Sequence, residues 1–574
     1  MPLKTLSYSP PRASFLGLPL EMRQQIYLEY FTVEGGYIYD VEADKITQAS
    51  RRPIDLSLRY ACRTIARETY HFPFTLNIIT FSTAYRRDWR KQAAAVDFIS
   101  TYHHLLQRAM LIRLRHCLTP DMYNKPSNQY TRYMQVIIDD IADIIRSERR
   151  YPKFNPESLE TVHIESFMKH PSDRSSAGDL TKISVYHNNV SSRRTYTYLL
   201  RKIANMYPKE FNEAIDKFLP GWSKCKSNPA SDFFSLGFDF WAIPSLSEAT
   251  DMVEQLQLTE RWNRLDQWRY SEMREEGYTG TRYGYQRKHF FSAAALAIRF
   301  LKSISQEQRL LITKLVLNED RMAVGNPECH INGLILFAEE NPNLLIENKV
   351  NLWRNIIPKS AGIDVSTFLT ENESVVELPE RLPSPHQVHS EWVGRAISNF
   401  IMHTLEALRD GLPAHSYSFI FDGEPNLNHS TETFKSLMEL PIAWITANTE
   451  CIARGLLASP EDNNYPFRTS PSVSKNVSVQ ERGSIIQCNF TLDQPWDYKT
   501  IAEDKVRNKH HWKTLDALHS HASGVHTPNY GKLDVSNGAV DWPQIKGEYF
   551  EMQPLCDVPS KETEALGFSG GLQE

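Results

Sequence analysis

The sequence lacks the patterns that commonly mark a reaction centre, a metal site or a nucleotide site. Its seven cysteines are scattered and odd in number, and no two of them form a C-x-x-C pair. This usage is typical of reduced thiols and not of a disulfide framework or a structural zinc site. The chain also contains no phosphate-cradling G-x-x-x-x-G-K-[ST] sequence and no H-E-x-x-H helix. We therefore expect no enzyme activity, no cofactor and no metal.

Long apolar runs and a marked excess of one charge are missing as well. The N-terminus holds no apolar core of a signal peptide, and the longest apolar helical stretch, residues 290–301, is too short to span a bilayer. The net charge of −5 provides no basic face of the size that nucleic-acid binding needs. These absences indicate a soluble intracellular protein, cytoplasmic and/or nuclear, that is not secreted and has no membrane partner, and they argue against a nucleic-acid partner.

What is present is the composition of an ordinary globular protein. Hydrophobic residues make up 41% and charged residues 23% of the 574 positions, so the chain can bury more than one core. Helical spacing dominates, and we expect a mainly α fold with minor β (α+β). The expected order is a disordered N-terminus (1–14), a helical unit with a small hairpin (15–85), a mainly helical middle domain (86–377), a Pro-rich linker (378–390), a helical C-terminal region (391–527) and an irregular, disordered tail (528–574).

Periodicity also predicts individual elements. Two short runs at Tyr37–Tyr39 and Lys45–Thr47 are typical of a β-hairpin, and Leu76–Phe81 is typical of a strand. Apolar residues recur at helical spacing in residues 91–101, 104–115, 134–146, 197–218, 247–257, 290–303, 306–316 and 392–409. We find no repeat at a solenoid or propeller period.

The most informative segment is Phe15–Tyr30. Pro19 predicts the start of a helix, because proline at the first helical position gives up no useful N–H group. Met22, Ile26 and Tyr30 follow at four-residue steps and form one apolar stripe. The pattern predicts a short amphipathic helix whose stripe faces a partner.

These residues carry a resemblance to a known family. The segment resembles the F-box-like N-terminal domain of many filamentous-fungal proteins in Leu18-Pro19-x-Glu21-x-Arg23-x-x-Ile26-Tyr27, followed in a second predicted helix (58–70) by Cys62-Arg63-x-Ile65-x-x-Glu68. In a true F-box the first helix docks its apolar stripe against the small adaptor subunit of a cullin-type ubiquitin ligase. The resemblance implies a substrate receptor whose remaining domains hold an unknown protein substrate. The residues that it assigns to the adaptor contact are Leu18, Pro19, Leu20, Met22 and Ile26.

Similarity to a group of uncharacterised fungal proteins extends into residues 290–353. This part contains a cluster of possible metal ligands: Glu319, Asp320, Glu328, Cys329 and His330. Zinc needs thiolates and imidazoles that converge, whereas adjacent residues point apart in regular structure. We interpret the cluster as structural, with Pro327 beginning a helix that ends before Pro342.

A second hypothesis places a ligand site in the loop 276–290. Its aromatic and basic residues interleave, and such loops stack on bases or capture phosphorylated partners. The residues concerned are Tyr278, Arg282, Tyr283, Tyr285, Arg287 and Lys288. The chain would then be an RNA or phospho-ligand binder.

A third hypothesis is a self-contained scaffold that does not bind a ligase adaptor. The hairpin predicted between residues 31 and 54 interrupts the two helices, where an F-box runs on almost without a break. The sequence also contains no leucine-rich or propeller array of the kind that commonly reads ligase substrates. In a scaffold of this kind, the apolar stripe is packed inside the chain's own body.

Overall fold

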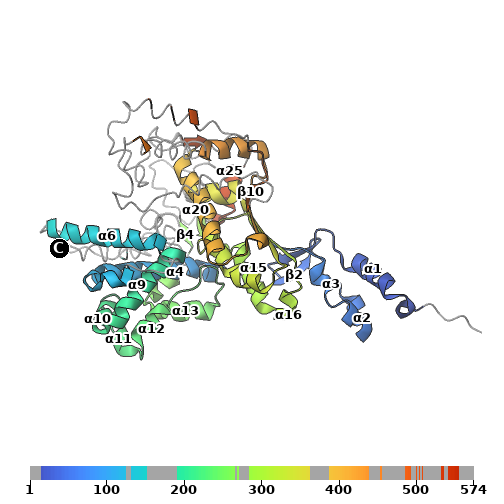
Figure 1. Ribbon diagram of the computed structural model, residues 1–574, viewed down its shortest axis with the longest axis horizontal. Helices are drawn as coiled ribbons and strands as arrows, with labels where there is room; N and C mark the ends of the chain where they lie inside the picture. Colours follow the sequence, from blue (N-terminus) through green and yellow to red (C-terminus); the bar gives the residue numbers. More distant parts are fainter. Residues whose placement is uncertain are drawn as a thin grey trace, which may run out of the picture.

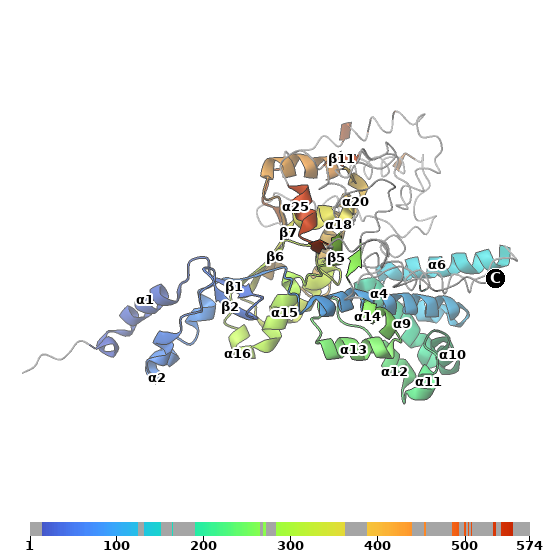
Figure 2. The same ribbon diagram turned by 180° about the vertical axis from the view of Figure 1, so that it is seen from behind.

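The computed structural model has three bodies (Figure 1). An N-terminal arm lies at one end of the long axis, a sheet with helices lies in the middle, and a helical lobe lies beyond it, as the view from behind also shows (Figure 2). The structure describes residues 14–123, 131–150, 164, 190–264, 268–270, 283–361, 387–438, 453–454, 485–492, 499–500, 503, 507, 532–534 and 541–554. The expected disordered N-terminus, except its last residue, and most of the expected linker lie outside these residues.

A seven-stranded sheet forms the centre. Its strand order is β10-β9-β7-β6-β3-β1-β2, and all neighbours are parallel except the hairpin β1–β2. The strands are β1 (Tyr37–Asp40), β2 (Lys45–Gln48), β3 (Ile79–Ser82), β6 (Lys314–Glu319), β7 (Leu345–Asn351), β9 (Tyr417–Asp422) and β10 (Ile486–Cys488). The predicted hairpin and the strand after it are confirmed. The prediction of a mainly α fold is wrong, because this sheet makes the protein an α/β fold.

Apart from β2, the described strands of this sheet follow one another in chain order, without reversal. Open α/β sheets bind their ligands where the strand order reverses, so the described sheet offers no such crevice. Successive right-handed crossovers in one direction place the helices on one face. The rings of Phe81 and Phe419 accordingly lie 5.7 and 5.9 Å from those of Phe300 and Phe400, which belong to the covering helices.

The layer that covers the sheet is formed by segments within residues 293–361 and 390–438. It consists of α15 (Ala293–Ser303), α16 (Gln306–Arg309), the 3-10 helix η4 (Pro327–Leu334), α17 (Ile335–Glu340), the π-helical η5 (Leu352–Ile356), α18 (Ile357–Ala361), α20 (Ser390–Arg409), η6 (Ala414–Ser416) and a helix at 427–438. The helices predicted at 290–303 and 392–409 are confirmed. The helix predicted at 306–316 is wrong beyond Arg309, since β6 begins at Lys314.

The N-terminal arm is a small helical unit attached to the hairpin edge of the sheet (Figure 1). It contains η1 (Phe15–Gly17), α1 (Leu20–Phe31), η2 (Ser57–Tyr60), α2 (Arg63–Glu68) and α3 (Phe72–Thr75). The helix predicted at 58–70 is therefore split into η2 and α2. Tyr27, Phe31, Ile65 and Phe72 form a core of their own in this arm.

The helical lobe is built around α4 (Arg90–Arg113), which merges the helices predicted at 91–101 and 104–115. The helix predicted at 197–218 is two helices, because Pro208 begins a new one at its first position. The other members are η3 (Arg115–Cys117), α5 (Pro120–Tyr123), α6 (Thr131–Arg150), α9 (Val190–Met206), α10 (Pro208–Phe218), α11 (Trp222–Cys225), α12 (Pro229–Phe234), α13 (Leu246–Gln255) and α14 (Thr259–Arg264). This lobe also has its own apolar core.

Two small antiparallel sheets use segments near the C-terminus. β12 (Phe550–Pro554) pairs with β5 (Tyr283–Arg287), which also pairs with β4 (Arg269–Tyr270), and β11 (Lys532–Asp534) pairs with β8 (Gln387–His389). Helix α25 (Trp542–Gly547) precedes β12. Within the tail that we expected to be irregular at 528–574, the described residues 532–534 and 541–554 include β11, α25 and β12.

The chain leaves the sheet for the helical lobe and returns at one place. Ala84, just after β3, and Phe291, just before α15, exchange both backbone hydrogen bonds, with N–O distances of 3.0 and 2.9 Å. Nearby, Nε of Arg90 donates to the carbonyl oxygen of Arg287 at 2.9 Å. The lobe is thus an insertion with adjacent ends.

Candidate protein-docking site

Helix α1 has one side packed against the arm and one side exposed. Tyr27 and Phe31 face inward and are at most 2% exposed. The Phe31 ring stacks on that of Phe72 in α3, with 6.2 Å between centroids. Pro19 immediately precedes the helix as its N-cap, one position before the place that the sequence indicated. Glu21 lies in the first turn, where its charge suits the positive end of the helix dipole.

A polar cluster fastens α1 to α2. Arg23 forms a two-point ion pair with Glu68, with Nη2–Oε1 at 2.7 Å and Nε–Oε2 at 3.0 Å. The hydroxyl of Tyr27 donates to the same carboxylate at 2.7 Å. The hydrogen bonds from Arg23, and then from Tyr27, lower the pKa of Glu68, whereas burial above all raises the pKa of Tyr27 to about 12. The Arg23 guanidinium also donates to the carbonyl oxygen of Leu18 at 2.6 Å, which positions the turn before the helix.

The two helices η1 and α1 and the turn between them also carry exposed apolar side chains, which we call the outer ridge. Its residues are Leu16, Leu18, Leu20, Met22, Ile26 and Tyr30. They are between 37% and 54% exposed, and Met22 is the most exposed. Pro19 is exposed beside them. All five residues selected from the sequence are thus exposed, as are Leu16 and Tyr30, although the Tyr30 hydroxyl also accepts from the Leu58 backbone N at 3.4 Å. The four-residue steps had already indicated Tyr30, whereas no spacing pointed to Leu16.

One buried side chain attaches the arm to the sheet. Asn77, between α3 and β3, is 2% exposed. Its Oδ1 accepts from the Val33 backbone N at 2.9 Å, and its Nδ2 donates to the carbonyl oxygen of Phe31 at 2.7 Å. The same amide nitrogen lies 3.2 Å from the hydroxyl of Tyr37 in β1. The C-terminal end of α1 is thereby fixed relative to the first strands.

The alternative site at 276–290 is only partly described. Tyr278 and Arg282 lie outside the described residues. The segment Tyr283–Arg287 is a strand and not a loop. It lies in the centre of a three-stranded sheet and includes Tyr285. The ammonium of Lys288 lies 5.7 Å from the Tyr85 ring centroid. The described part of this segment thus uses its backbone to hold β12 and β4.

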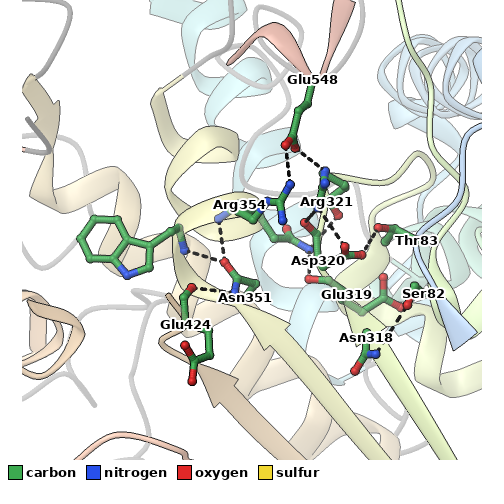
Figure 3. A network of polar contacts seen from close by, with 12 residues as sticks. Ser82, Thr83, Asn318, Glu319, Asp320, Arg321, Asn351, Arg354, Glu424 and Glu548 are labelled. Carbon is green, nitrogen blue, oxygen red and sulfur yellow. Dashed lines mark hydrogen bonds and ion pairs between the residues drawn. The ribbon is translucent and has the colours of Figure 1, made fainter. Parts of the chain in front are cut away.

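The carboxyl ends of the parallel strands are filled by the chain's own polar groups (Figure 3). Glu548, from the segment between α25 and β12, points between Arg321 and Arg354 and pairs with both. Asp320, beside them, accepts from the hydroxyl of Thr83 and pairs with Arg321 at 2.8 Å. Asp320, Arg321, Arg354 and Glu548 are thus engaged with one another at the edge where α/β proteins commonly hold ligands.

The cluster interpreted as structural in the sequence is distributed over separate contacts. Glu328 pairs with Lys359 at 2.7 Å, and the Cys329 thiol lies 3.0 Å from the carbonyl oxygen of Asn326. As predicted, η4 begins at Pro327, and α17 ends at Glu340. Among the described residues, no group of three or more His, Cys, Asp or Glu side chains is placed to hold a metal ion.

A serine–histidine pair inside this cluster is buried. The Ser292 Oγ lies 2.6 Å from Nδ1 of His330, whose Nε2 lies 2.7 Å from the carbonyl oxygen of Gly325. Both side chains are at most 1% exposed, and burial lowers the pKa of His330 to about 4. Ser292 also caps α15 by accepting from the Ala295 backbone N. The pair holds η4 against α15, and no substrate reaches it in this arrangement.

Comparison of the chain with protein-family models, with curated proteins and with solved structures found no match in any of the three. The F-box-like resemblance therefore stays a prediction from the residues of the motif. Within the described part of the chain, no helix combines the length and apolar character that crossing a membrane requires.

Proposed function

We propose that this chain is an interaction protein whose outer ridge docks onto the adaptor subunit of a cullin-type ubiquitin ligase. The other two bodies are then available to hold a protein substrate. The observation that supports the proposal is the exposure of the outer ridge on a helix that is otherwise fixed in the arm. The F-box-like motif supplies the identity of the partner.

Exposed apolar side chains on a fixed helix favour docking because covering them removes apolar surface from water. Met22, Ile26 and Tyr30 repeat at four-residue steps, the spacing with which an amphipathic helix enters a hydrophobic groove. The ion pair and Asn77 hold the helix before any partner arrives. Docking to such a preorganised helix loses less conformational entropy than docking to a disordered segment.

The scaffold hypothesis places the apolar stripe inside the chain's own body. The exposure of Met22 and Ile26 speaks against that arrangement, because these side chains contact solvent instead of the arm's core. Tyr27 and Phe31 supply that core from the other side of the helix.

The proposal is tested by titrating the purified full chain with the purified adaptor subunit in a calorimeter. We expect binding by the wild type and a loss of at least about tenfold in affinity for Met22→Asp, since a buried apolar side chain contributes about 1.5–3 kcal/mol and the new carboxylate adds a desolvation cost. Leu336→Asp is the matched control. Leu336 lies on α17, is 74% exposed, and is more than 250 positions away from the arm in the sequence.

Two outcomes contradict the proposal. The first is a wild-type chain that does not bind the adaptor. The second is equal binding by the wild type and Met22→Asp, which would place any adaptor contact elsewhere.

A further inference from the structure

A concavity of about 460 Å³ lies along α9, where the helical lobe meets the central body. We call it the α9 pocket. Ligand sites commonly occupy about 300–1,000 Å³ and occur where separate bodies meet. One side of the pocket is α9, and the other is the aromatic segment 238–241. The lining residues that matter here are Arg194, Thr197, Arg201, Lys202, Phe238 and Trp241.

The polar side of the pocket is one face of a single helix. Residues 194, 197, 198, 201, 202 and 205 all line it and recur at steps of three and four, so they stack along one side of α9. The opposite face holds Leu199, Leu200 and Ile203, which are fully buried in the lobe's core. The helix therefore has a fixed orientation that presents its basic residues to the pocket.

Arg193 fixes the aromatic side of the pocket. Its Nη1 donates to the carbonyl oxygen of Phe238 at 3.1 Å, and its Nη2 donates to that of Ser100 in α4 at 3.0 Å. The guanidinium also lies 4.1 Å from the Phe240 ring centroid. Burial lowers the pKa of Arg193 to about 10, so the side chain remains a cation at neutral pH. Arg193 therefore adds positive charge close to the aromatic side of the pocket, which it also positions.

Two exposed cations at the pocket have no carboxylate partner. Arg201 lies over the Phe234 ring at 5.3 Å, and Lys202 lies over the Tyr198 ring at 5.6 Å, and neither forms an ion pair in the described chain. By contrast, Arg194 pairs with Asp410 at 2.6 Å. Arg201 and Lys202 are thus available to an anionic ligand.

We propose that the α9 pocket binds a phosphorylated side chain on an exposed segment of a partner protein. Arginine forms paired hydrogen bonds with phosphate oxygens, and lysine adds a point charge. The Thr197 hydroxyl, which accepts from Gln107 at 2.9 Å, keeps its own proton to donate. Trp241 and Phe238 offer apolar surface to the residues that flank the phosphate.

The charges around the pocket favour a single phosphate over a nucleic acid. Asp239 lines the pocket, and Asp410 lies beside Arg194. A continuous phosphate backbone would bring further negative charges close to these carboxylates, which would repel them. A single phosphorylated side chain can contact Arg201 and Lys202 without bringing further phosphates close to Asp239 and Asp410. The role of this pocket in recognising a ligase substrate rests on the function proposed above, but the binding itself does not.

The experiment uses the full chain and an immobilised degenerate library of nonapeptides with a central phosphothreonine, beside the same library without phosphate. We expect the wild type to be retained at least about tenfold better by the phosphorylated library, and Arg201→Ala/Lys202→Ala to lose this preference, since each charge-assisted contact contributes about tenfold or more. Lys209→Ala/Lys217→Ala, on the exposed side of neighbouring α10, removes the same charge and is the matched control.

Further measurements in the same experiment separate this inference from the docking proposal. Met22→Asp should retain the wild-type preference for phosphopeptides, even if adaptor binding fails for every variant. Equal retention on both libraries, or equal loss in the two double variants, overturns the inference. A 20-nucleotide single-stranded RNA that binds as tightly as the phosphopeptides also overturns it, in favour of a nucleic-acid site.

Discussion

Arg23 and Glu68, 45 positions apart in the sequence, meet in a two-point ion pair on the inner side of α1. The pair joins α1 to α2, so it fixes the helix that carries Met22 and Ile26 of the outer ridge. Parallel hydrogen bonds of this kind fix geometry as well as supplying attraction. The same helix thus carries both residues of the exposed ridge and one partner of this ion pair.

Removing the carboxylate should loosen α1. We expect Glu68→Ala to speed amide hydrogen exchange in residues 20–31 at pH 7, measured by mass spectrometry, with Glu29→Ala on the exposed side of α1 as the control. The pKa of Glu68 is lowered in the folded chain, so its stabilisation is present above the unfolded value near 4.5 and is lost as the pH falls through the folded value. Wild-type α1 should therefore loosen in acid, and the variant should lack this response. Unchanged exchange in Glu68→Ala would remove the orienting role.

Asn77 joins the arm to the sheet through hydrogen bonds that no apolar residue can replace. We expect Asn77→Ala to lower the free energy of unfolding by about 3 kcal/mol, because it leaves the buried Val33 N–H and Phe31 carbonyl groups unpaired. The measurement is urea denaturation followed by circular dichroism. Asn343→Ala, at an exposed position, should change the value by less than about 0.5 kcal/mol. Similar values for the two variants would contradict this account.

Gly36 lies where β1 enters the sheet beside β3. Its φ is +68°, and an added Cβ would lie 2.5 Å from the carbonyl oxygen of Ile78. Gly221 has a similar φ of +81° with nothing within 4 Å of an added Cβ. Gly221→Ala should therefore cost only the left-handed backbone penalty of about 1–2 kcal/mol. Gly36→Ala should lower the free energy of unfolding by roughly 2 kcal/mol more than Gly221→Ala does, as measured by thermal unfolding. Equal losses in the two variants would show that the close approach of Gly36 to the Ile78 carbonyl oxygen is unimportant.

Glu319 makes stability depend on pH. Burial raises its pKa to about 7, above an unfolded value of 4.5, although the Ala294 backbone N donates to it. The favourable contribution of the protonated form is complete below pH 4.5 and declines as the pH rises through 7, by about 3 kcal/mol in total. Glu319→Gln should abolish this decline in melting temperature between pH 5 and 8, whereas the exposed Glu307→Gln should keep it. A Glu319→Gln variant that still loses stability over this range would contradict the assignment.

Local sequence patterns were sufficient to predict the elements whose contacts are near in sequence. The hairpin at residues 37–48 pairs with itself across a short turn, and α15 shows its buried apolar run directly. Three residues of the outer ridge, Met22, Ile26 and Tyr30, were also predicted from their four-residue steps, because an exposed helix keeps its own periodicity.

The parallel sheet could not be recognised in the same way. The first half of β6, residues 314–316, was interpreted as the end of a helix, because a buried parallel strand has a nearly continuous apolar run without alternation. Its neighbour β3 lies more than 200 residues earlier, so no local signal connects them. The basic face of α9 was missed for another reason. Its three- and four-residue recurrence is visible in the sequence, but only the fold shows that Phe238 and Trp241 lie opposite it.

The contact between Ala84 and Phe291 has a consequence for how this chain tolerates change. Because the excursion into the helical lobe starts and finishes at the same backbone bridge, its length can vary without shifting β3 against β6. Insertions and replacements are absorbed best where the two junctions already touch. The lobe beyond the first two turns of α4, whose Ala93 and Val96 belong to the core of the sheet, is therefore the part that can be exchanged while the arm keeps its place on the sheet.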